Sequence, residues 1–161
     1  MSHCDELIID VTKVLKKKSL PYVFRNMSLA EVTVHTPVKV LDKVVPFKEF
    51  ISVSERDIQC FGVMPFSVKE DQRALASEYL MRVNWYLQTG WFSLDYSDGE
   101  VRARVERSHI HSRPDEEDLS VLIMTPITMI STYMSGLILT IQGHGTPQEN
   151  AEKYTPDALK A

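Results

Sequence analysis

The stretch from Leu119 to Gln142 contains no charged residue, and this feature constrains the fold of the chain more than any other. A run of this length can cross a bilayer as a single helix. However, Pro126, Gly136 and many Ser and Thr residues interrupt its apolar character, and no Lys or Arg stands directly at either end to orient it. We therefore expect no membrane span, but a helix buried between layers or subunits of a globular protein.

The composition is that of one folded unit. The chain has 161 residues, of which 43% are hydrophobic and 25% charged, so it can bury a core without disulfide bonds. We expect one α+β domain over residues 1–145 and a C-terminal tail over residues 146–161. The net charge of −4 argues against a nucleic-acid partner, because such partners are bound largely by neutralising phosphates.

The first residues indicate the compartment. They are acidic and lack the basic and then apolar pattern of a signal peptide. The two cysteines, Cys4 and Cys60, are too few for a disulfide framework or a multi-cysteine zinc site. We expect a cytoplasmic protein with reduced thiols.

Apolar residues at helical spacing predict three helices, over residues 5–18, 69–88 and 114–142. We expect Gly90 to end the second helix, because glycine readily adopts a left-handed conformation. Pro126 lacks an N–H group, so we expect it to kink or interrupt the third.

Alternating residues predict the strands. They mark a hairpin over residues 47–63, and the Asp98-Gly99 dipeptide between two alternating runs marks a second over residues 92–105. Residues 19–46 hold a less regular strand. The expected fold is a mostly antiparallel sheet of about five strands with helices packed on it, in the order helix, three strands, helix, two strands, helix.

No group of residues typical of catalysis stands out, and we expect no catalytic residue, cofactor or metal ion. His109 and His111 lie two residues apart, but a zinc site would need further ligands nearby. Arg102 and Arg104 share one strand face, which is typical of cross-strand pairing. The alternative is a small-ligand or metal sensor, or an enzyme, with a pocket near these four residues.

Three segments carry motifs that are similar to those of a known family: Phe61–Pro65, Arg82–Trp85 and Gly90–Arg102, the last of which includes an aromatic strand and an Asp-Gly-Glu turn. In these segments the chain resembles the YbjN family of bacterial sensory transduction regulators. The similarity covers roughly Phe47 to Lys153. Trp91 departs from the smaller polar residue that the family usually carries.

The resemblance implies the fold of type III secretion chaperones, a mostly antiparallel sheet with packed helices. Those chaperones are small, acidic and cytoplasmic, often form homodimers, and bind extended stretches of other proteins. The resemblance brings no catalytic residues to this chain, and its shared motifs bear on fold more than on function.

We therefore expect a non-enzymatic protein-binding module, either a chaperone-like protein or a regulatory adaptor. An exposed sheet edge would bind an extended segment of another protein through main-chain hydrogen bonds. Surplus apolar residues predict a surface for self-association as a homodimer. These interface candidates are Trp85, Trp91, Ile127, Ile130, Tyr133, Met134 and Leu137.

Overall fold

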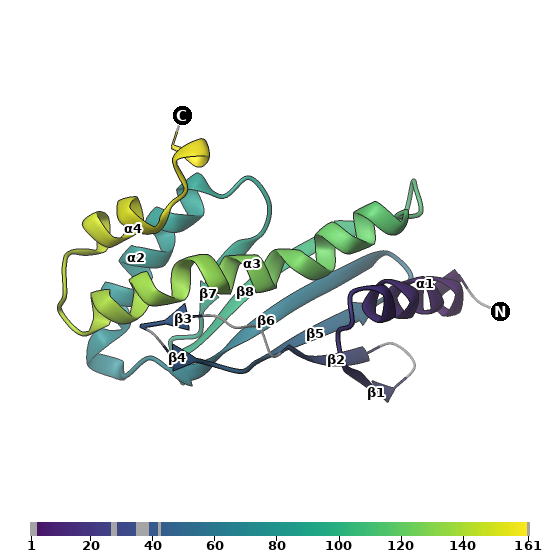
Figure 1. Ribbon diagram of the computed structural model, residues 1–161, viewed down its shortest axis with the longest axis horizontal. Coiled ribbons are helices and arrows are strands. Elements are labelled where there is room, and N and C mark those ends of the chain that lie inside the picture. The colour runs from purple at the N-terminus through teal and green to yellow at the C-terminus, as the bar shows by residue number, and fades with distance from the viewer. Residues whose placement is uncertain (1–2, 27–28, 35–38, 42, 161) are drawn as a thin grey trace.

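The computed structural model describes residues 3–26, 29–34, 39–41 and 43–160 of the chain (Figure 1). The helices are α1 (His3–Lys17), α2 (Arg73–Tyr86), α3 (Glu116–Ile141) and α4 (Pro147–Tyr154), with 3-10 turns at Glu70–Gln72 and Asp157–Leu159. The strands are β1 (Tyr22–Asn26), β2 (Leu29–Val34), β3 (Lys39–Val40), β4 (Lys43–Val44), β5 (Phe47–Val53), β6 (Asp57–Ser67), β7 (Trp91–Leu94) and β8 (Glu100–Ser108).

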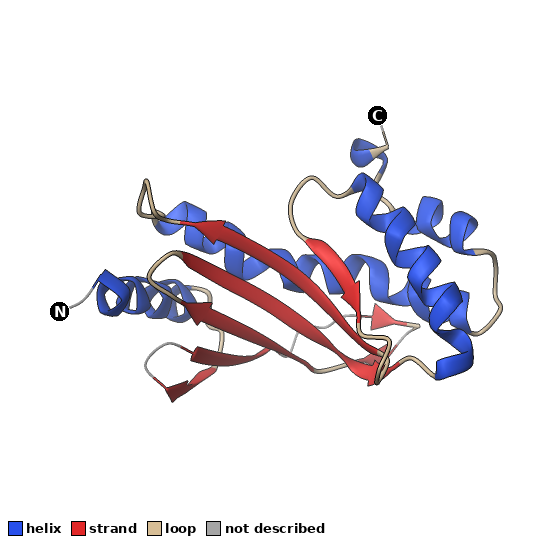
Figure 2. Ribbon diagram, turned by 180° about the vertical axis from the view of Figure 1, so that it is seen from behind, coloured by secondary structure: helices blue, strands red, loops and turns tan. Residues whose placement is uncertain are grey.

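Six strands form one antiparallel sheet in the order β1-β2-β5-β6-β8-β7, and β3 and β4 form a separate two-stranded ladder. The helices lie on one side of the sheet, and no described helix crosses in front of β5, β6 and β8 when the molecule is seen from the other side (Figure 2). The predicted α+β class with a mostly antiparallel sheet is confirmed. The sheet has six strands instead of about five because residues 19–46 supply both β1 and β2.

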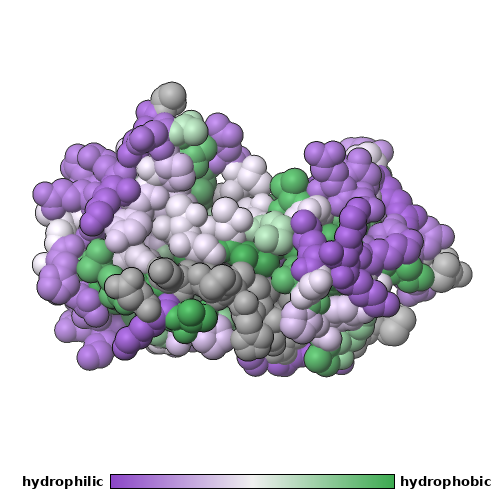
Figure 3. Space-filling view, viewed as in Figure 1, coloured by the Kyte–Doolittle hydropathy of each residue, from purple (hydrophilic) through white to green (hydrophobic). Residues whose placement is uncertain are grey.

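Helix α3 is the central element of the core. Asp115 caps its first turn by accepting a hydrogen bond from the Asp118 N–H at 2.8 Å. Gly143, at φ +79°, follows its last turn and lets the chain leave in a left-handed conformation. Hydrophilic residues gather at both ends of the face that carries α3, with less polar residues between them (Figure 3).

The uncharged run that makes α3 long and apolar enough to cross a membrane is used for packing. Its most apolar window has a mean hydropathy of 1.6, and 61% of that window is buried inside the molecule. The helix packs on β6 and β8 and contacts α1, α2 and α4. This burial matches the expectation of a helix enclosed between layers.

We predicted that Pro126 would kink or interrupt the third helix; the interruption is wrong, because α3 is helical on both sides of this residue. Pro126 is buried where α3 passes closely over β6 at Gly62. A Cβ atom on Gly62 would lie 2.8 Å from Ile130 Cδ1 and 3.4 Å from Pro126 Cβ. This close packing, and not local propensity, keeps the helix continuous.

Five of the predicted interface residues belong to the core of the single chain. These are Ile127, Ile130, Tyr133, Met134 and Leu137, all of which are buried on α3. We correct their assignment to a self-association surface, because a second copy would reach them only if the core opened.

We predicted a tail over residues 146–161; residue 161 lies outside the described residues, and residues 146–160 do not form a tail. Thr146 caps α4, which packs against both α2 and α3. Asn150 of α4 donates from Nδ2 to Thr140 Oγ1 at 3.0 Å and to the His144 carbonyl oxygen at 2.9 Å. These buried contacts make α4 part of the same folded unit.

Helix α2 ends earlier than predicted, at Tyr86, and Leu87 after it is extended. Gly90 therefore does not cap the helix. It adopts φ +77° where the chain enters β7, and a Cβ atom there would lie 2.6 Å from the Arg104 carbonyl oxygen. Gly90 is required by this close approach to β8.

Candidate functional site

Strand β8 is much longer than the edge strand beside it. β7 pairs with β8 only from Trp91 opposite Arg104 to Leu94 opposite Val101. Residues Val105–Ser108 continue β8 beyond that ladder and pair on their other side with β6. We call this segment the free edge of β8. An unpaired strand edge presents main-chain donors and acceptors that can pair with another chain.

Two hydrogen bonds show which main-chain groups face the free edge. The Phe92 N–H donates to Asn84 Oδ1 at 2.7 Å, and Asn84 Nδ2 donates to the Phe92 carbonyl oxygen at 3.0 Å. The N–H and C=O groups of Phe92 therefore point away from β8. Residues directly opposite each other in an antiparallel ladder either bond each other or both point away, so the N–H and C=O groups of Ala103, opposite Phe92, point toward β6. The His109 N–H, which bonds the Arg56 carbonyl oxygen at 2.9 Å, fits the same alternation.

Because main-chain directions alternate along a strand, Glu106 and Ser108 point their N–H and C=O groups away from β6, toward the free edge. Among the described residues, no ladder or loop hydrogen bond satisfies them on that side. The outer edge of β7, in contrast, is closed at Phe92 by the Asn84 side chain. The sheet thus offers a strand partner at β8 while it protects β7.

Helix α3 runs beside the free edge on the helix side of the sheet. Its Asp118 forms an ion pair with Arg107 of β8. One end of the edge is marked by Gly90, where a Cβ atom would lie 3.3 Å from Thr125 Cγ2 and 2.6 Å from the Arg104 carbonyl oxygen. Val121, between these two contacts on α3, therefore lies alongside the free edge.

A mainly apolar hollow of about 390 Å³ begins beside Val121 and continues along α3 to Tyr133, where Pro156 and Leu159 also line it. We call it the α3 groove. It is lined on α3 by Val121, Met124, Thr125 and Thr128, and across from them by Gln88 and Thr89. The Val121 side chain is 53% exposed, and Thr125 donates its hydroxyl to the Val121 carbonyl oxygen at 2.7 Å. The described residues that line this hollow carry no charge, and the Thr125 hydroxyl is already bonded within the helix.

The uncovered face of the sheet carries aromatic and basic side chains. Phe50 and Phe61 stack with ring centroids 5.1 Å apart. The guanidinium of Arg102 lies 4.9 Å from the Phe61 centroid and that of Arg104 lies 5.6 Å from it. Arg25 lies 5.7 Å from the Phe50 centroid. Because guanidinium groups and the neighbouring ring occupy these rings, few aromatic faces remain open for stacking with a ligand.

The four residues proposed to share one ligand pocket lie at two places. Arg102 and Arg104 line a polar hollow of about 390 Å³ with Asp95 and Glu100, and Arg102 forms an ion pair with Glu100. His109 and His111 line a different hollow of about 630 Å³ near the start of α1. The structure therefore does not support a single pocket built from all four.

His109 is buried, whereas His111, which lines the same hollow, is exposed. His109 is only 4% exposed, its Nε2 lies 2.9 Å from the Ser54 carbonyl oxygen, and its ring centroid lies 5.1 Å from that of His3. Its buried Nδ1 has no hydrogen-bond partner among the described residues.

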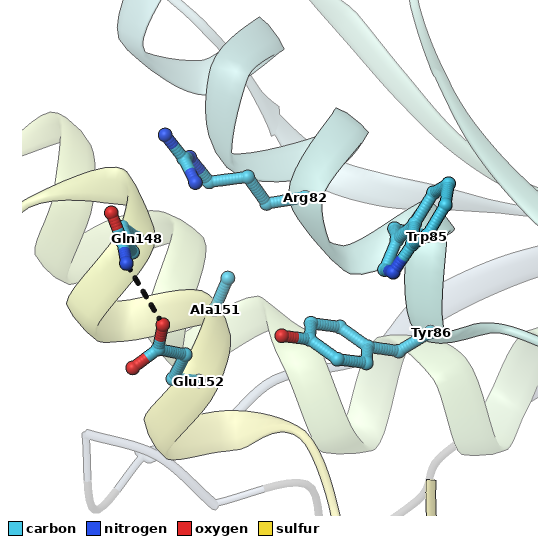
Figure 4. A pocket seen from close by; sticks show the side chains of 6 residues that line it. All are labelled: Arg82, Trp85, Tyr86, Gln148, Ala151 and Glu152. Atoms are coloured by element: carbon cyan, nitrogen blue, oxygen red, sulfur yellow. Dashed lines mark hydrogen bonds between the residues drawn. The ribbon is translucent and has the colours of Figure 1, made fainter. Parts of the chain in front are cut away.

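Of the residues predicted to form a self-association surface, the two tryptophans are the ones that reach the surface. The Trp85 side chain is 86% exposed on α2, and that of Trp91 is 38% exposed on β7. Trp85 lies beside a small hollow of about 120 Å³, which Arg82 and Tyr86 of α2 share with Gln148, Ala151 and Glu152 of α4 (Figure 4). The size of this hollow suits a side chain better than a separate ligand.

The described part of the chain shows neither a metal site nor a reactive site at Cys60. No cluster of three or more His, Cys, Asp or Glu residues there has the geometry to hold a metal ion. Burial raises the pKa of the Cys60 thiol well above its usual value, and nearby Glu49 raises it further. Cys60 is therefore held as an unreactive thiol.

Reasoning from the sequence did not locate the free edge of β8. A signal was present, since the apolar alternation after Gly99 runs well past the length that β7 can match. The capping of β7 by Asn84 depends on how α2 packs, which no local pattern shows. No family model matches this chain, and no curated protein matches it at a significant level.

Proposed function

We propose that this protein is a non-enzymatic protein-binding module, a chaperone-like protein or regulatory adaptor, that binds an extended segment of another protein. The segment would add a strand to the free edge of β8. The resemblance to the YbjN family and to type III secretion chaperones supports the same function, and we propose that the protein acts in the cytoplasm.

The observation that carries this proposal is the unmatched length of β8. Four residues at about 3.3 Å each leave an edge about 13 Å long. Along it, the main-chain groups of Glu106 and Ser108 face away from β6. Strand addition uses such groups for affinity and flanking pockets for side-chain selectivity. The α3 groove supplies a flanking pocket of this kind.

Proline at position 106 tests the proposal. Glu106→Pro removes the outward N–H group but no hydrogen bond to β6, and proline is tolerated on a strand edge in this orientation. Glu106→Ala is the matched control, because it removes the same side chain and keeps the N–H group. Both variants should unfold near the wild-type temperature in a thermal melt followed by circular dichroism.

The binding measurement uses gentle affinity purification from the organism that encodes the protein, with co-purifying proteins quantified by mass spectrometry. We expect one partner at near-equal amount with the wild type. Glu106→Ala reports the loss of the side chain alone, and with Glu106→Pro the partner should fall by about threefold to tenfold relative to Glu106→Ala, the value of one main-chain hydrogen bond. Equal recovery with both variants would refute binding at this edge.

A second candidate function is a small-ligand sensor at the hollow beside His109. The observation that favours it is the unpartnered, buried Nδ1 of His109 next to the exposed side chains of Arg56 and His111. Inorganic phosphate and zinc are suitable probes, because binding to the folded state raises the melting temperature. The sensor function would be excluded if neither phosphate nor zinc changed the melting temperature of the wild type and if His109→Ala melted at the same temperature as the wild type.

A further inference from the structure

We infer that the bound segment carries a basic residue next to an apolar residue, with the basic side chain opposite Glu106 and the apolar side chain opposite Arg107, beside Val121 of α3. This inference rests on the proposed strand addition. It adds the chemistry of the partner, which follows from the two surfaces that meet at the free edge of β8.

The helix side of the edge selects apolar residues. Val105 is buried beneath the helices, and Arg107 reaches Asp118 of α3, so both side chains point to this side. Residues opposite each other on neighbouring strands point to the same face. The partner residue opposite Arg107 would therefore approach Val121, which is 53% exposed, and the aliphatic stem of Arg107, whose guanidinium is already paired with Asp118. An apolar side chain at this position would cover both surfaces.

The uncovered side of the edge selects a positive charge. Glu106 is exposed on this face, and no ion pair joins it to a cation within the described ranges of the chain. The nearest basic residue on the same face of β8, Arg104, leans over the Phe61 ring, with 5.6 Å between guanidinium and centroid. A Lys or Arg directly across from Glu106 would form a favourable cross-strand pair.

Trp91 adds a second reason for a basic residue. It shares the uncovered face with Arg104, its partner in the ladder, and is partly exposed. The partner residue opposite Glu106 would occupy the next position on the same face along the line of β7. The aliphatic stem of a Lys or Arg could then lie on the Trp91 indole and keep its charge near the Glu106 carboxylate.

A second copy of this chain fits the edge less well. Two free edges related by a twofold axis would pair antiparallel. In the two registers that use the main-chain groups of Glu106, like charges face each other, either Glu106 opposite Glu106 or Arg107 opposite Arg107. Like charges directly opposite destabilise a strand pair. The edge therefore favours a segment of a different protein.

A display library of short random peptides, selected on the immobilised full-length protein, tests this inference. The wild type should enrich peptides in which a Lys or Arg stands next to an apolar residue. Glu106→Ala should keep strand binding and lose the preference for the basic residue. Glu106→Lys should enrich Asp or Glu at that position, and Glu106→Pro should lose the enrichment.

Synthetic copies of an enriched peptide give the affinities. Replacing its basic residue with Glu should weaken binding to the wild type by about tenfold and strengthen binding to Glu106→Lys. If peptides bind through the Glu106 N–H but with no charge preference, the partner chemistry is wrong and strand addition stands. If Glu106→Pro selects and binds the same peptides as Glu106→Ala, strand addition itself is wrong, and the inference fails with it.

Discussion

The side chain of Asn84 brackets the main chain of Phe92, accepting from its N–H at 2.7 Å and donating to its carbonyl oxygen at 3.0 Å. Through these two bonds, α2 occupies the outer edge of β7 as a further strand would. Among the described residues, no side chain covers the neighbouring strand β8 in this way over Val105–Ser108 on its β7 side. On this side of the sheet, the open edge of β8 is therefore confined to a short segment beside Val121 of α3, whereas at the opposite side the edge strand is β1, which pairs only with β2 in the described part of the chain.

Asn84→Ala should destabilise the protein, because it leaves the Phe92 N–H and C=O groups without their side-chain partner. We expect a loss of about 1–3 kcal/mol in the free energy of unfolding. Urea denaturation followed by tryptophan fluorescence measures this loss. Asn84→Asp keeps an acceptor for the Phe92 N–H group and loses the donor to the Phe92 carbonyl oxygen. Its stability should therefore lie between those of the wild type and Asn84→Ala. If Asn84→Ala were as stable as the wild type, the two hydrogen bonds between Asn84 and Phe92 would not be needed for stability.

Gly62→Ala should destabilise the protein by about 1–3 kcal/mol, because the new Cβ atom would lie 2.8 Å from Ile130 Cδ1 in a tightly packed core. Ile130→Val removes that Cδ1 atom. The double variant should therefore be more stable than the sum of the two single losses predicts, which thermal and urea unfolding can measure as a double-mutant cycle. Strict additivity would contradict the close approach of α3 to β6.

Glu49 should make the protein less stable as the pH rises. Its side chain is fully buried, both carboxylate oxygens lack a hydrogen-bond partner among the described residues, and burial raises its pKa well above the usual 4.5. The folded state then binds a proton that the unfolded chain releases. The stabilisation is complete below pH 4.5 and falls by up to about 1.4 kcal/mol per pH unit until the folded-state pKa is reached.

Glu49→Gln is the control for this pH dependence, because the amide is similar in size and carries no charge at any pH. Urea unfolding at a series of pH values from about 5 to about 8 measures the free energy of unfolding of both proteins. This free energy should fall less with rising pH for Glu49→Gln than for the wild type. Equal slopes for the two proteins would mean that Glu49 is ionised in the folded state.

Trp85→Ala and Ile130→Asp should have very different effects on stability, because Trp85 is exposed and Ile130 is buried in the core. The Trp85 side chain is 86% exposed, so its removal should change the free energy of unfolding by no more than about 0.5 kcal/mol. Ile130 is fully buried, and a charge at its position should unfold the chain. Light scattering then tests the predicted homodimer: a dimer that Trp85→Ala dissociates would assign self-association to α2, and a dimer that it leaves intact would exclude this residue.

Local patterns were sufficient to predict the elements whose causes are local. The Asp98-Gly99 turn joins β7 and β8 as expected, because glycine at 99 adopts φ +80°. Asp115 begins α3, and the lysines at 16 and 17 end α1. In each case the signal and its structural effect lie within a few residues of each other.

The candidate site could be predicted only in part. An exposed sheet edge was expected, but the strand that carries it was not identified, and five of the seven residues proposed for an interface are core residues of α3. A stretch of uncharged residues has the same appearance whether its cover is a sheet of the same chain or another subunit. The sequence therefore indicated that α3 must be covered and did not indicate by what.

The sequence by itself determined the class of the fold, the order of its main helices and hairpins, and the need to bury the run from Leu119 to Gln142, because periodicity and capping act over short distances. The tertiary structure alone decided that α3 continues through Pro126 over Gly62, that Asn84 closes β7, and that β8 keeps an unpaired end at Glu106. These outcomes depend on contacts between residues far apart in the chain, whose pairing and packing no local pattern records.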